Sequence, residues 1–496
     1  MPAASSLTAR LAVLAVALLA GGCSSDNDAT VEIVAIGERG SLFQHGGRLA
    51  SPDQLVRAAT AEGLVAFDAD GRVIPALADR WIVLDDGQSY IFRLRDGRWR
   101  DGREITAQSA RLALREAIAR LKGSPLALDL AVIDDIRTMA GRVIEIRLRQ
   151  PLPDLLQLLA QPELGLINRG SGAGPMQLAR SGDAATLAPI DPERLGLPAV
   201  RNWSKRVRQL KLVALPAEAA VRRFSSGGCD LVLGGRAQQF PLAGALGISR
   251  GTIRLDPVLG LFGLVVVDGA GFLETPNNRE ALAMAIDRDA LVQAFGVGGW
   301  MPSTRVIPSE VEDADAMAGE RWSGVSLDER RRQARGVVQR WRAGGAARAG
   351  WDRLRIALPD GPGSDLIFDR LRQDFAAIGL SALRVAEAAD ADLRLVDENA
   401  RYARAAWFLN RFNCGVRRSL CDAGADALMD QVRVVSSPDD RSRLLREAAA
   451  SLTAANVFIP IAKSPLRWSL VRGDATGFAT NRIGWHPLMP MALKPR

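Results

Sequence analysis

The stretch from residue 261 to residue 300 constrains the fold more than any other part of the chain. Residues 261–267 form an apolar, β-branched run bordered by glycine, which is typical of a buried strand. Asp268 and Gly269 then predict a turn. A polar side chain within residues 276–278 can cap the first free N–H groups of a helix, and the glycines within residues 296–299 end that helix. The order is therefore buried strand, turn, capped helix and glycine-rich loop.

A β-meander is predicted closer to the N-terminus. Apolar side chains alternate with polar ones over residues 90–94, as they do on a strand with one buried face. Asp-Gly pairs at residues 86–87 and 96–97 supply turns on both sides of this strand. Thr106 then caps a helix that we expect over residues 108–121.

Four segments carry a resemblance to a known family. They read PALADRW at 75–81, DDGQSYIFRLRDG at 85–97, WRDGREITA at 99–107 and NREALAMAIDR at 278–288. The chain resembles the family 5 extracellular solute-binding proteins, whose patterns are P-x-L-A-x-x-W, D-G-x-x-[YW]-x-F-x-L-R, W-x-D-G-x-x-[VI]-T-A and N-x-x-V-R-x-A-L-x-x-A-I-D-R. These proteins are the peptide-, nickel- and opine-type binding components of ABC transporters.

The resemblance implies an α/β fold with two lobes, the periplasmic-binding-protein fold of type II (cluster C-like), and an extra β-rich domain. A ligand held between two hinged lobes favours the closed state, because its contacts with both lobes exist only there. The expected division is a lipoprotein signal peptide with its lipidated cysteine (1–23), a tether and the start of lobe I (24–50), the β-rich domain (51–163), lobe I (164–257), lobe II (258–469) and a return to lobe I (470–496).

Two further regions carry local predictions. Residues 129–140 favour a helix or a loop. Residues 354–358, 365–378 and 383–385 are predicted as strand, helix and strand, which together make a βαβ unit. Residues 468–485 are expected to lead back to lobe I.

The N-terminus predicts export and a lipid anchor. Arg10 precedes an apolar run over residues 11–20, which is too short to span a bilayer and is typical of a secretory signal. Small residues directly before Cys23 resemble a bacterial lipobox, although Ala20 stands where leucine is usual. The prediction is a protein on the periplasmic side of the cell envelope, anchored to a membrane through lipid on Cys23. Ordinary signal cleavage near the same place is the alternative.

The other cysteines suggest one disulfide. Cys414 and Cys421 bound the short loop CGVRRSLC, and a bond between them would stiffen it. Cys229 lies in an apolar setting and is predicted to be a buried, inert thiol.

Several side chains are candidates for contact with a ligand. Phe43 and His45 follow the first predicted strand, a position that lines the cleft in the family. Trp300, Trp407 and Phe408 are candidates for stacking, because ligand sites use aromatic faces with a few polar anchors. Rings of this kind are more often core residues than ligand contacts, and Trp300, in a glycine-rich loop, is the best candidate among them.

One departure from the family concerns the ligand. Peptide-binding members carry an acidic residue that pairs with the free amino group of the peptide, whereas the matching segment 407–413 has no acid and contains Asn410 and Arg411. The ligand is therefore expected to lack an N-terminal ammonium or to carry an anionic group near Arg411. The alternative is that Arg411 faces solvent and the two segments are misaligned by a few residues.

Composition and spacing argue against other functions. Of the 64 basic residues five are lysine, so 59 are arginine, but they are spread along the chain among acids and do not predict nucleic-acid binding. The two histidines, His45 and His486, lie far apart, and no His or Cys spacing suits zinc. No Gly-x-Ser-x-Gly elbow is present. No cofactor, metal or enzymatic activity is predicted.

The sequence thus predicts a monomeric, lipid-anchored binding protein that delivers a peptide or other small solute to an ABC permease and its ATPase. A lipid-anchored protein that keeps this fold as a sensor or structural partner, without transport, is the alternative.

Overall fold

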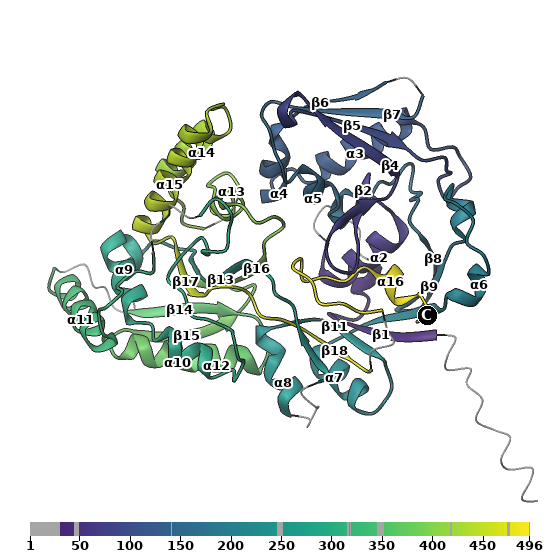
Figure 1. Ribbon diagram of the computed structural model, residues 1–496. Helices are drawn as coiled ribbons and strands as arrows, with labels where there is room; N and C mark the ends of the chain where they lie inside the picture. Colours follow the sequence, from purple (N-terminus) through teal and green to yellow (C-terminus); the bar gives the residue numbers. More distant parts are fainter. Residues whose placement is uncertain are drawn as a thin grey trace, which may run out of the picture.

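The computed structural model describes residues 30–43, 49–139, 141–245, 251–314, 317, 319–344, 352–416, 419–473 and 477–495. These residues build sheets of seven, five, four and two strands (Figure 1). The predicted signal peptide with Cys23, and the candidate His45, lie outside the described residues.

The seven-stranded sheet forms lobe I. Its strand order is β12-β18-β11-β1-β10-β9-β8, and β1 pairs in parallel with both β10 and β11. The strands are β1 (Thr30–Ile36), β8 (Met176–Ser181), β9 (Ala184–Pro189), β10 (Gln209–Leu215), β11 (Leu231–Arg236), β12 (Ile253–Leu255) and β18 (Arg467–Val471). Strand β18 belongs to this sheet, although residues up to 469 were assigned to lobe II.

Helices cover both faces of this sheet, and the side chains of β1 contact helices on each face. Ile33 and Ala35 pack with α2 (Ser51–Thr60) and α16 (Leu488–Met491), whereas Val34 packs with α7 (Ala217–Ser225) and α8 (Phe240–Ala245) on the opposite face. Successive side chains of a strand point to opposite faces, so a central strand covered on both sides is a continuous apolar run.

The five-stranded sheet forms lobe II, in the order β15-β14-β16-β13-β17. Every residue of β13 is buried, which confirms the strand predicted there. The βαβ prediction is also confirmed: β14 and β15 are parallel and α12 connects them. The strands are β13 (Gly260–Val266), β14 (Arg353–Leu358), β15 (Ser381–Ala386), β16 (Leu393–Asn399) and β17 (Phe458–Ala462).

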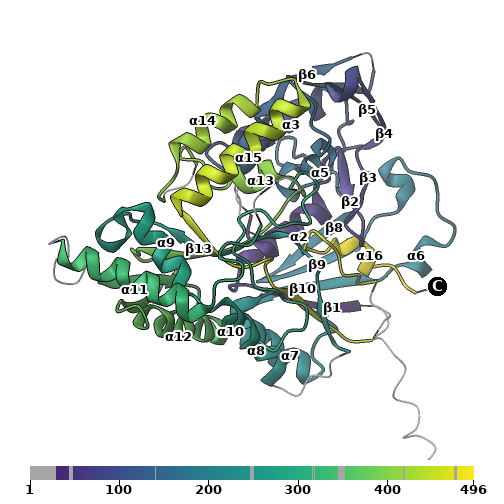
Figure 2. The ribbon, with the colours of Figure 1, turned by 60° about the vertical axis from the view of Figure 1, so that its left-hand side comes forward.

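Two groups of helices sandwich this sheet (Figure 2). Phe262, Leu264 and Val266 pack against the first group, while Leu261 and Val265 face the second. The first group is α9 (Pro276–Ala285), α10 (Arg288–Gln293), α11 (Leu327–Ala343) and α12 (Pro362–Ala376), and the second is α13 (Ala405–Asn410), α14 (Ala423–Val432) and α15 (Pro438–Ala455). The cap of α9 is Thr275, whose hydroxyl accepts from the N–H of Asn278, rather than one of the residues predicted to cap it.

The β-rich part contains the predicted meander and one strand that was not expected. Thr106 caps α3 (Ala107–Arg120) reciprocally with Ser109, as the sequence predicts. Residues 133–138 form strand β6 instead of a helix or loop, because they pair with β7 and bury Ile136 beneath the sheet. The remaining elements are β2 (Val65–Phe67), β3 (Val73–Pro75), β4 (Ala78–Leu84), β5 (Ser89–Leu94), β6 (Ile133–Thr138), β7 (Val143–Leu148), α4 (Pro125–Asp129) and α5 (Leu155–Leu159).

The arrangement is the two-lobed α/β fold with an extra β-rich part that the resemblance implied. The residue limits of the domains remain predictions. Helix α2 packs in the core of lobe I, although residues 51–163 were assigned to the β-rich domain.

Candidate functional site

A cavity of about 270 Å³ lies where the two lobes meet. Lobe I contributes the C-terminal ends of β1 and β11 and the start of α2, and lobe II contributes the end of β16 and the residues that follow it. Residues 483–486, which return to lobe I, close one side. Ligands of open α/β sheets commonly bind at the carboxyl ends of strands, so this position is a natural one for a solute.

Two further spaces share lining residues with this cavity. A space of about 890 Å³ shares Leu49, Glu398, Arg401 and Arg411 with it. Another of about 330 Å³ shares Arg236, Asp397 and Glu398. We call the three connected spaces the interlobe cleft.

An ion pair between lobe II and the β-rich part lines the cleft. Arg401 donates to both carboxylate oxygens of Glu163, at 2.8 and 3.0 Å, and to the side-chain oxygen of Gln161 at 2.8 Å. Gln54 of α2 donates to the same carboxylate at 3.2 Å. Burial alone would raise the pKa of Glu163, but the attraction and hydrogen bonds of Arg401 outweigh burial and lower it. Three parts of the chain therefore meet at one carboxylate.

Two further ion pairs line the cleft. Nε of Arg411 donates to Glu398 at 2.8 Å, and the guanidinium lies 5.1 Å from the centre of the Trp407 ring. Arg467 of β18 pairs with Asp397 at the end of β16, at 2.6 Å, with both side chains almost fully buried. Most of the charge in the cleft is thus neutralised within the protein.

The structure places Arg411 in the cleft, so it does not face bulk solvent. The other candidates in segment 407–413 lie outside the cleft. Trp407, Phe408 and Asn410 are buried and line none of its three spaces. Asn410 donates to Asp129 at 2.9 Å. The end of β16 and the residues after it contribute most of the lobe II lining.

Three of the aromatic candidates are buried in the core, the alternative that the sequence left open. Trp407 and Phe408 belong to α13 and are fully buried in the core, where their rings meet edge to face. Trp300 is 6% exposed, packs against Phe262 and Phe295, and donates from its indole nitrogen to the carbonyl of Ser464. Their faces are covered by protein, so we leave these three rings out of the proposed site.

Phe43 lies beside the interlobe cleft. It lines a separate cavity of about 410 Å³, which shares only Leu49 with the cleft, and the Arg180 guanidinium lies 4.2 Å from the centre of its ring. Leu49 is the first described residue after the segment that contains His45. The position after β1 therefore borders the cleft.

Charged residues that the sequence reasoning missed are Arg236, Asp397, Glu398 and Arg401. Asp397, Glu398 and Arg401 lie at or just after the end of β16, a strand whose sequence contains no recognisable motif. A signal did exist for Arg236, because Gly234 and Gly235 directly precede it, and glycines inside a strand pattern suggest a bulge.

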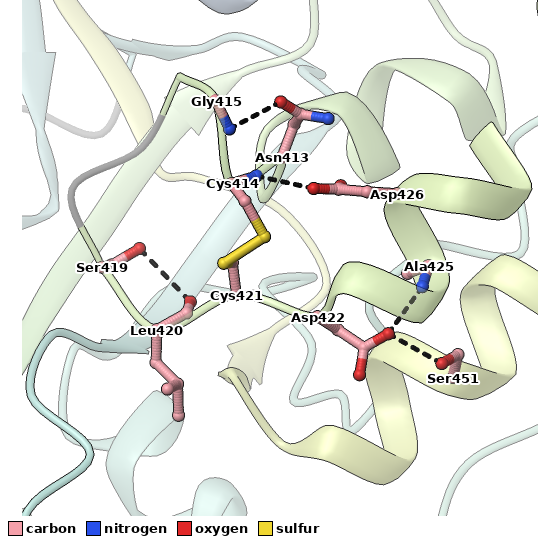
Figure 3. The surroundings of a disulfide bond; sticks show 10 residues. All are labelled: Asn413, Cys414, Gly415, Ser419, Leu420, Cys421, Asp422, Ala425, Asp426 and Ser451. Atoms are coloured by element: carbon pink, nitrogen blue, oxygen red, sulfur yellow. Dashed lines mark hydrogen bonds between the residues drawn. A yellow bond between two sulfur atoms is a disulfide. The ribbon is translucent and has the colours of Figure 1, made fainter. Parts of the chain in front are cut away.

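The predicted disulfide is present and borders the cleft. Cys414 and Cys421 are bonded, as Figure 3 shows. Their Cα atoms lie 5.3 Å apart. The backbone N–H of Cys414 donates to Asp426 of α14, and Cys414 also lines the 890 Å³ space. Cys229 is buried, and burial raises the pKa of its thiol to about 12, which agrees with an inert side chain.

No group of three or more His, Cys, Asp or Glu side chains that could hold a metal ion occurs in the described part of the chain. Among the helices that the structure describes, none combines the length and the apolar composition needed to cross a bilayer.

Comparison with known proteins gives a consistent result. The sequence model for "Bacterial extracellular solute-binding proteins, family 5 Middle" matches residues 72–380. The chain is 26% identical over 469 residues to the probable deoxycholate-binding periplasmic protein YgiS of Escherichia coli, covering 82% of each protein. It is 24% identical over 506 residues to the probable di/tripeptide-binding protein 5 of Pseudomonas aeruginosa, covering 87% of this chain and 89% of that protein.

The fold agrees with the same group of proteins. The structure of Haemophilus influenzae OppA in complex with the peptide RPPGFSPFR superposes with a TM-score of 0.79 at 17% identity, over 95% of this chain and 99% of that one. Because the family model covers well over half of the chain, the protein belongs to the bacterial extracellular solute-binding proteins of family 5, which are binding proteins of ABC importers and not enzymes.

Proposed function

We propose that this protein is the substrate-binding lipoprotein of an ABC importer. It captures a peptide-like or other small organic solute in the interlobe cleft and delivers it to the permease. The observation that carries this proposal is the composition of the 270 Å³ cavity, whose walls come from β1, α2 and β11 on one lobe and from β16 on the other. A solute that touches both walls stabilises the closed arrangement, which is the form that a permease would have to distinguish from the empty protein.

Among the candidates predicted from the sequence, Arg411 fits this site best. Its side chain lines two of the connected spaces, and its partner Glu398 lines all three. Phe43, which lies on the lobe I side next to the cleft, remains a candidate, and His45, outside the described residues, remains a candidate from the sequence alone. The pairing of Arg411 with Glu398 means that a ligand at this point meets a neutral ion pair rather than an isolated positive charge.

The proposed anchor is lipid on Cys23, followed by a short polar tether. A protein acylated there would stay on the periplasmic side of a membrane, near the permease, while its folded lobes remain in solution. More than one acyl chain is needed for stable anchoring, and bacterial lipoproteins of this kind carry several.

Native mass spectrometry of the protein purified from its own host tests the binding function. We expect a co-purified organic molecule to be retained at the mass of a one-to-one complex. An empty protein that also shows no thermal shift with peptides, opines or metal chelates would contradict the proposal. That result would favour the alternative, in which the fold serves as a sensor or structural partner.

A further inference from the structure

The charge of the cleft is unevenly balanced. Three of its arginines have carboxylate partners, as described above: Arg401 with Glu163, Arg411 with Glu398 and Arg467 with Asp397. Arg236 lines two of the connected spaces, and no carboxylate within the described residues forms an ion pair with it. The backbone carbonyl of Arg236 accepts a hydrogen bond from the indole nitrogen of Trp468 at 2.8 Å.

A β-bulge sets the position of the Arg236 side chain. The pairing of β11 with β18 shifts register between Val232 and Gly235, and Gly234 has a φ of +85°, which favours glycine. A Cβ on Gly235 would lie 2.2 Å from the Trp468 ring, so the residue before Arg236 must also be glycine. Bulges commonly re-aim a side chain next to a functional site. The sequence Gly-Gly-Arg therefore serves to present this arginine at the end of its strand.

Arg236 lies directly opposite another arginine. It pairs across the strands with Arg467, so two cations stand side by side, and of the two only Arg467 has an ion-pair partner, Asp397, among the described residues. Burial lowers the pKa of Arg467, Asp397 opposes this effect, and the charge of Arg236 adds to it. An anion bound at Arg236 would remove this repulsion, and guanidinium groups bind carboxylates well because two N–H donors match two oxygens.

Unpaired polar atoms surround the same cavity. Oδ2 of Asp397, Oδ1 of Asn399 and Nε1 of Trp485 are buried, belong to residues that line it, and have no hydrogen-bond partner among the described residues. Buried polar atoms in native proteins normally have partners, so these three remain available to a polar molecule that reaches them from the cavity. Two of them are acceptors, and one is a donor. The charge of Asp397 is already balanced by Arg467, so its remaining oxygen suits a neutral donor such as an amide N–H.

We propose that Arg236 is the anchor for a carboxylate group of the transported solute, and that the same solute donates hydrogen bonds from neutral groups to Asp397 and Asn399. The inference rests on the proposed function, because it assigns the class of solute for the same cleft. The solute is a small organic monoanion with at least two neutral donors. Its anionic group lies at Arg236 on lobe I, rather than at Arg411, whose charge Glu398 already neutralises.

The test compares three proteins purified in parallel from the same host: wild type, Arg236→Gln and Arg222→Gln. Arg222 is a matched control, because it lies on α7 of the same lobe, is exposed, and does not line the cleft. The molecule that co-purifies with wild type is released, identified by mass, and titrated back as the free acid and as its chemically prepared carboxamide. We expect wild type and Arg222→Gln to prefer the acid by roughly 10- to 100-fold, the effect of one charge-assisted interaction. Arg236→Gln should lose most of this preference.

Each outcome tests either the role of Arg236 or the proposed function of solute binding. A co-purified molecule without an anionic group, or equal affinity of wild type for acid and carboxamide, would overturn the role of Arg236 and leave solute binding intact. Unchanged preference in Arg236→Gln would do the same. A wild-type protein without any bound molecule would overturn the proposed function itself. Should Arg236→Gln fail to fold, Arg236→Lys keeps the charge but not the two-pronged geometry, and should bind the acid more weakly than wild type while still preferring it to the carboxamide.

Discussion

Arg401 and Glu163 form a two-pronged ion pair that joins lobe II to the β-rich part, with the Glu163 side chain only 3% exposed. The neighbouring residues reinforce the same contact: Tyr402 donates to Asp129 and Arg404 donates to Asp154. Residues 401–404, which follow β16, therefore make three polar contacts with the part of the chain between residues 125 and 164. This segment links the walls of the cleft.

Loss of this ion pair should lower the free energy of unfolding. In Arg401→Ala the buried carboxylate of Glu163 keeps only its weaker partners, and breaking a buried pair in this way typically costs about 3 kcal/mol in the free energy of unfolding. Urea unfolding measures the change. Arg443→Ala is the control, because Arg443 lies in an exposed pair-forming position on α15 and should change stability within experimental error. Equal effects of the two substitutions would show that the Arg401 pair contributes no more than a surface pair.

Asp129 should make stability depend on pH. Burial is the main reason that its pKa rises from 3.8 to about 6, while Asn410, Arg411 and Tyr402 oppose the rise. Between pH 4 and 6 the folded protein then binds more protons at this site than the unfolded chain. Its contribution to the free energy of unfolding therefore falls as the pH rises through this window, by up to about 3 kcal/mol, and is constant above it.

The variant Asp129→Asn isolates this effect. Its asparagine oxygen can still accept from Tyr402 and Asn410, but the side chain no longer titrates. The difference in stability between variant and wild type, measured by urea unfolding, should change between pH 4 and 6. Parallel pH profiles for the two proteins would refute the prediction.

The disulfide should stabilise the loop beside the cleft. Cys414 and Cys421 are separated by seven positions, and closing so short a loop contributes about 2 kcal/mol in the chain-entropy description. The double variant Cys414→Ser, Cys421→Ser should unfold at lower temperature than oxidised wild type. A reducing agent should lower the Tm of wild type and leave that of the double variant unchanged. A wild-type Tm that does not respond to reduction would argue that the bond contributes nothing to global stability.

Trp407 should matter for stability rather than for ligand recognition. It is fully buried, and truncating a buried tryptophan to alanine leaves a cavity that costs about 4 kcal/mol. Val434→Ala, at a side chain that is 78% exposed, is a control for which we expect little change. Urea unfolding measures the change in stability caused by each of the two substitutions. Unaltered stability of Trp407→Ala together with lost solute binding would restore the ring as a ligand contact.

Cys23→Ala should release the protein from the membrane. Without the thiol no acyl chain can be attached, and the folded part should then appear in the soluble periplasmic fraction. Fractionation followed by immunodetection measures this. Continued membrane retention of the variant would count against the lipid anchor.

Local sequence patterns predicted the elements of this fold well. The apolar run at 261–267, the turns around 90–94 and the cap at Thr106 all correspond to elements in the structure, because strand alternation, turn chemistry and helix capping depend on residues close together in the chain. Strand β6 was missed for the opposite reason. Its residues have mixed polarity, and only pairing with β7 makes them a strand.

The sequence by itself determined the family, the α/β class, the succession of strands and helices, and the loop in which Cys414 and Cys421 can meet. Only the tertiary structure decided which charges neutralise one another and which aromatic rings are covered. Glu163 and Arg401 are 238 positions apart, and so no pattern within either segment reveals that they meet. The same holds for Arg236, whose lack of a carboxylate partner in the described part of the chain depends on the fold. An ion pair or a buried face is a property of two surfaces in contact, and the path of the whole chain brings those surfaces together.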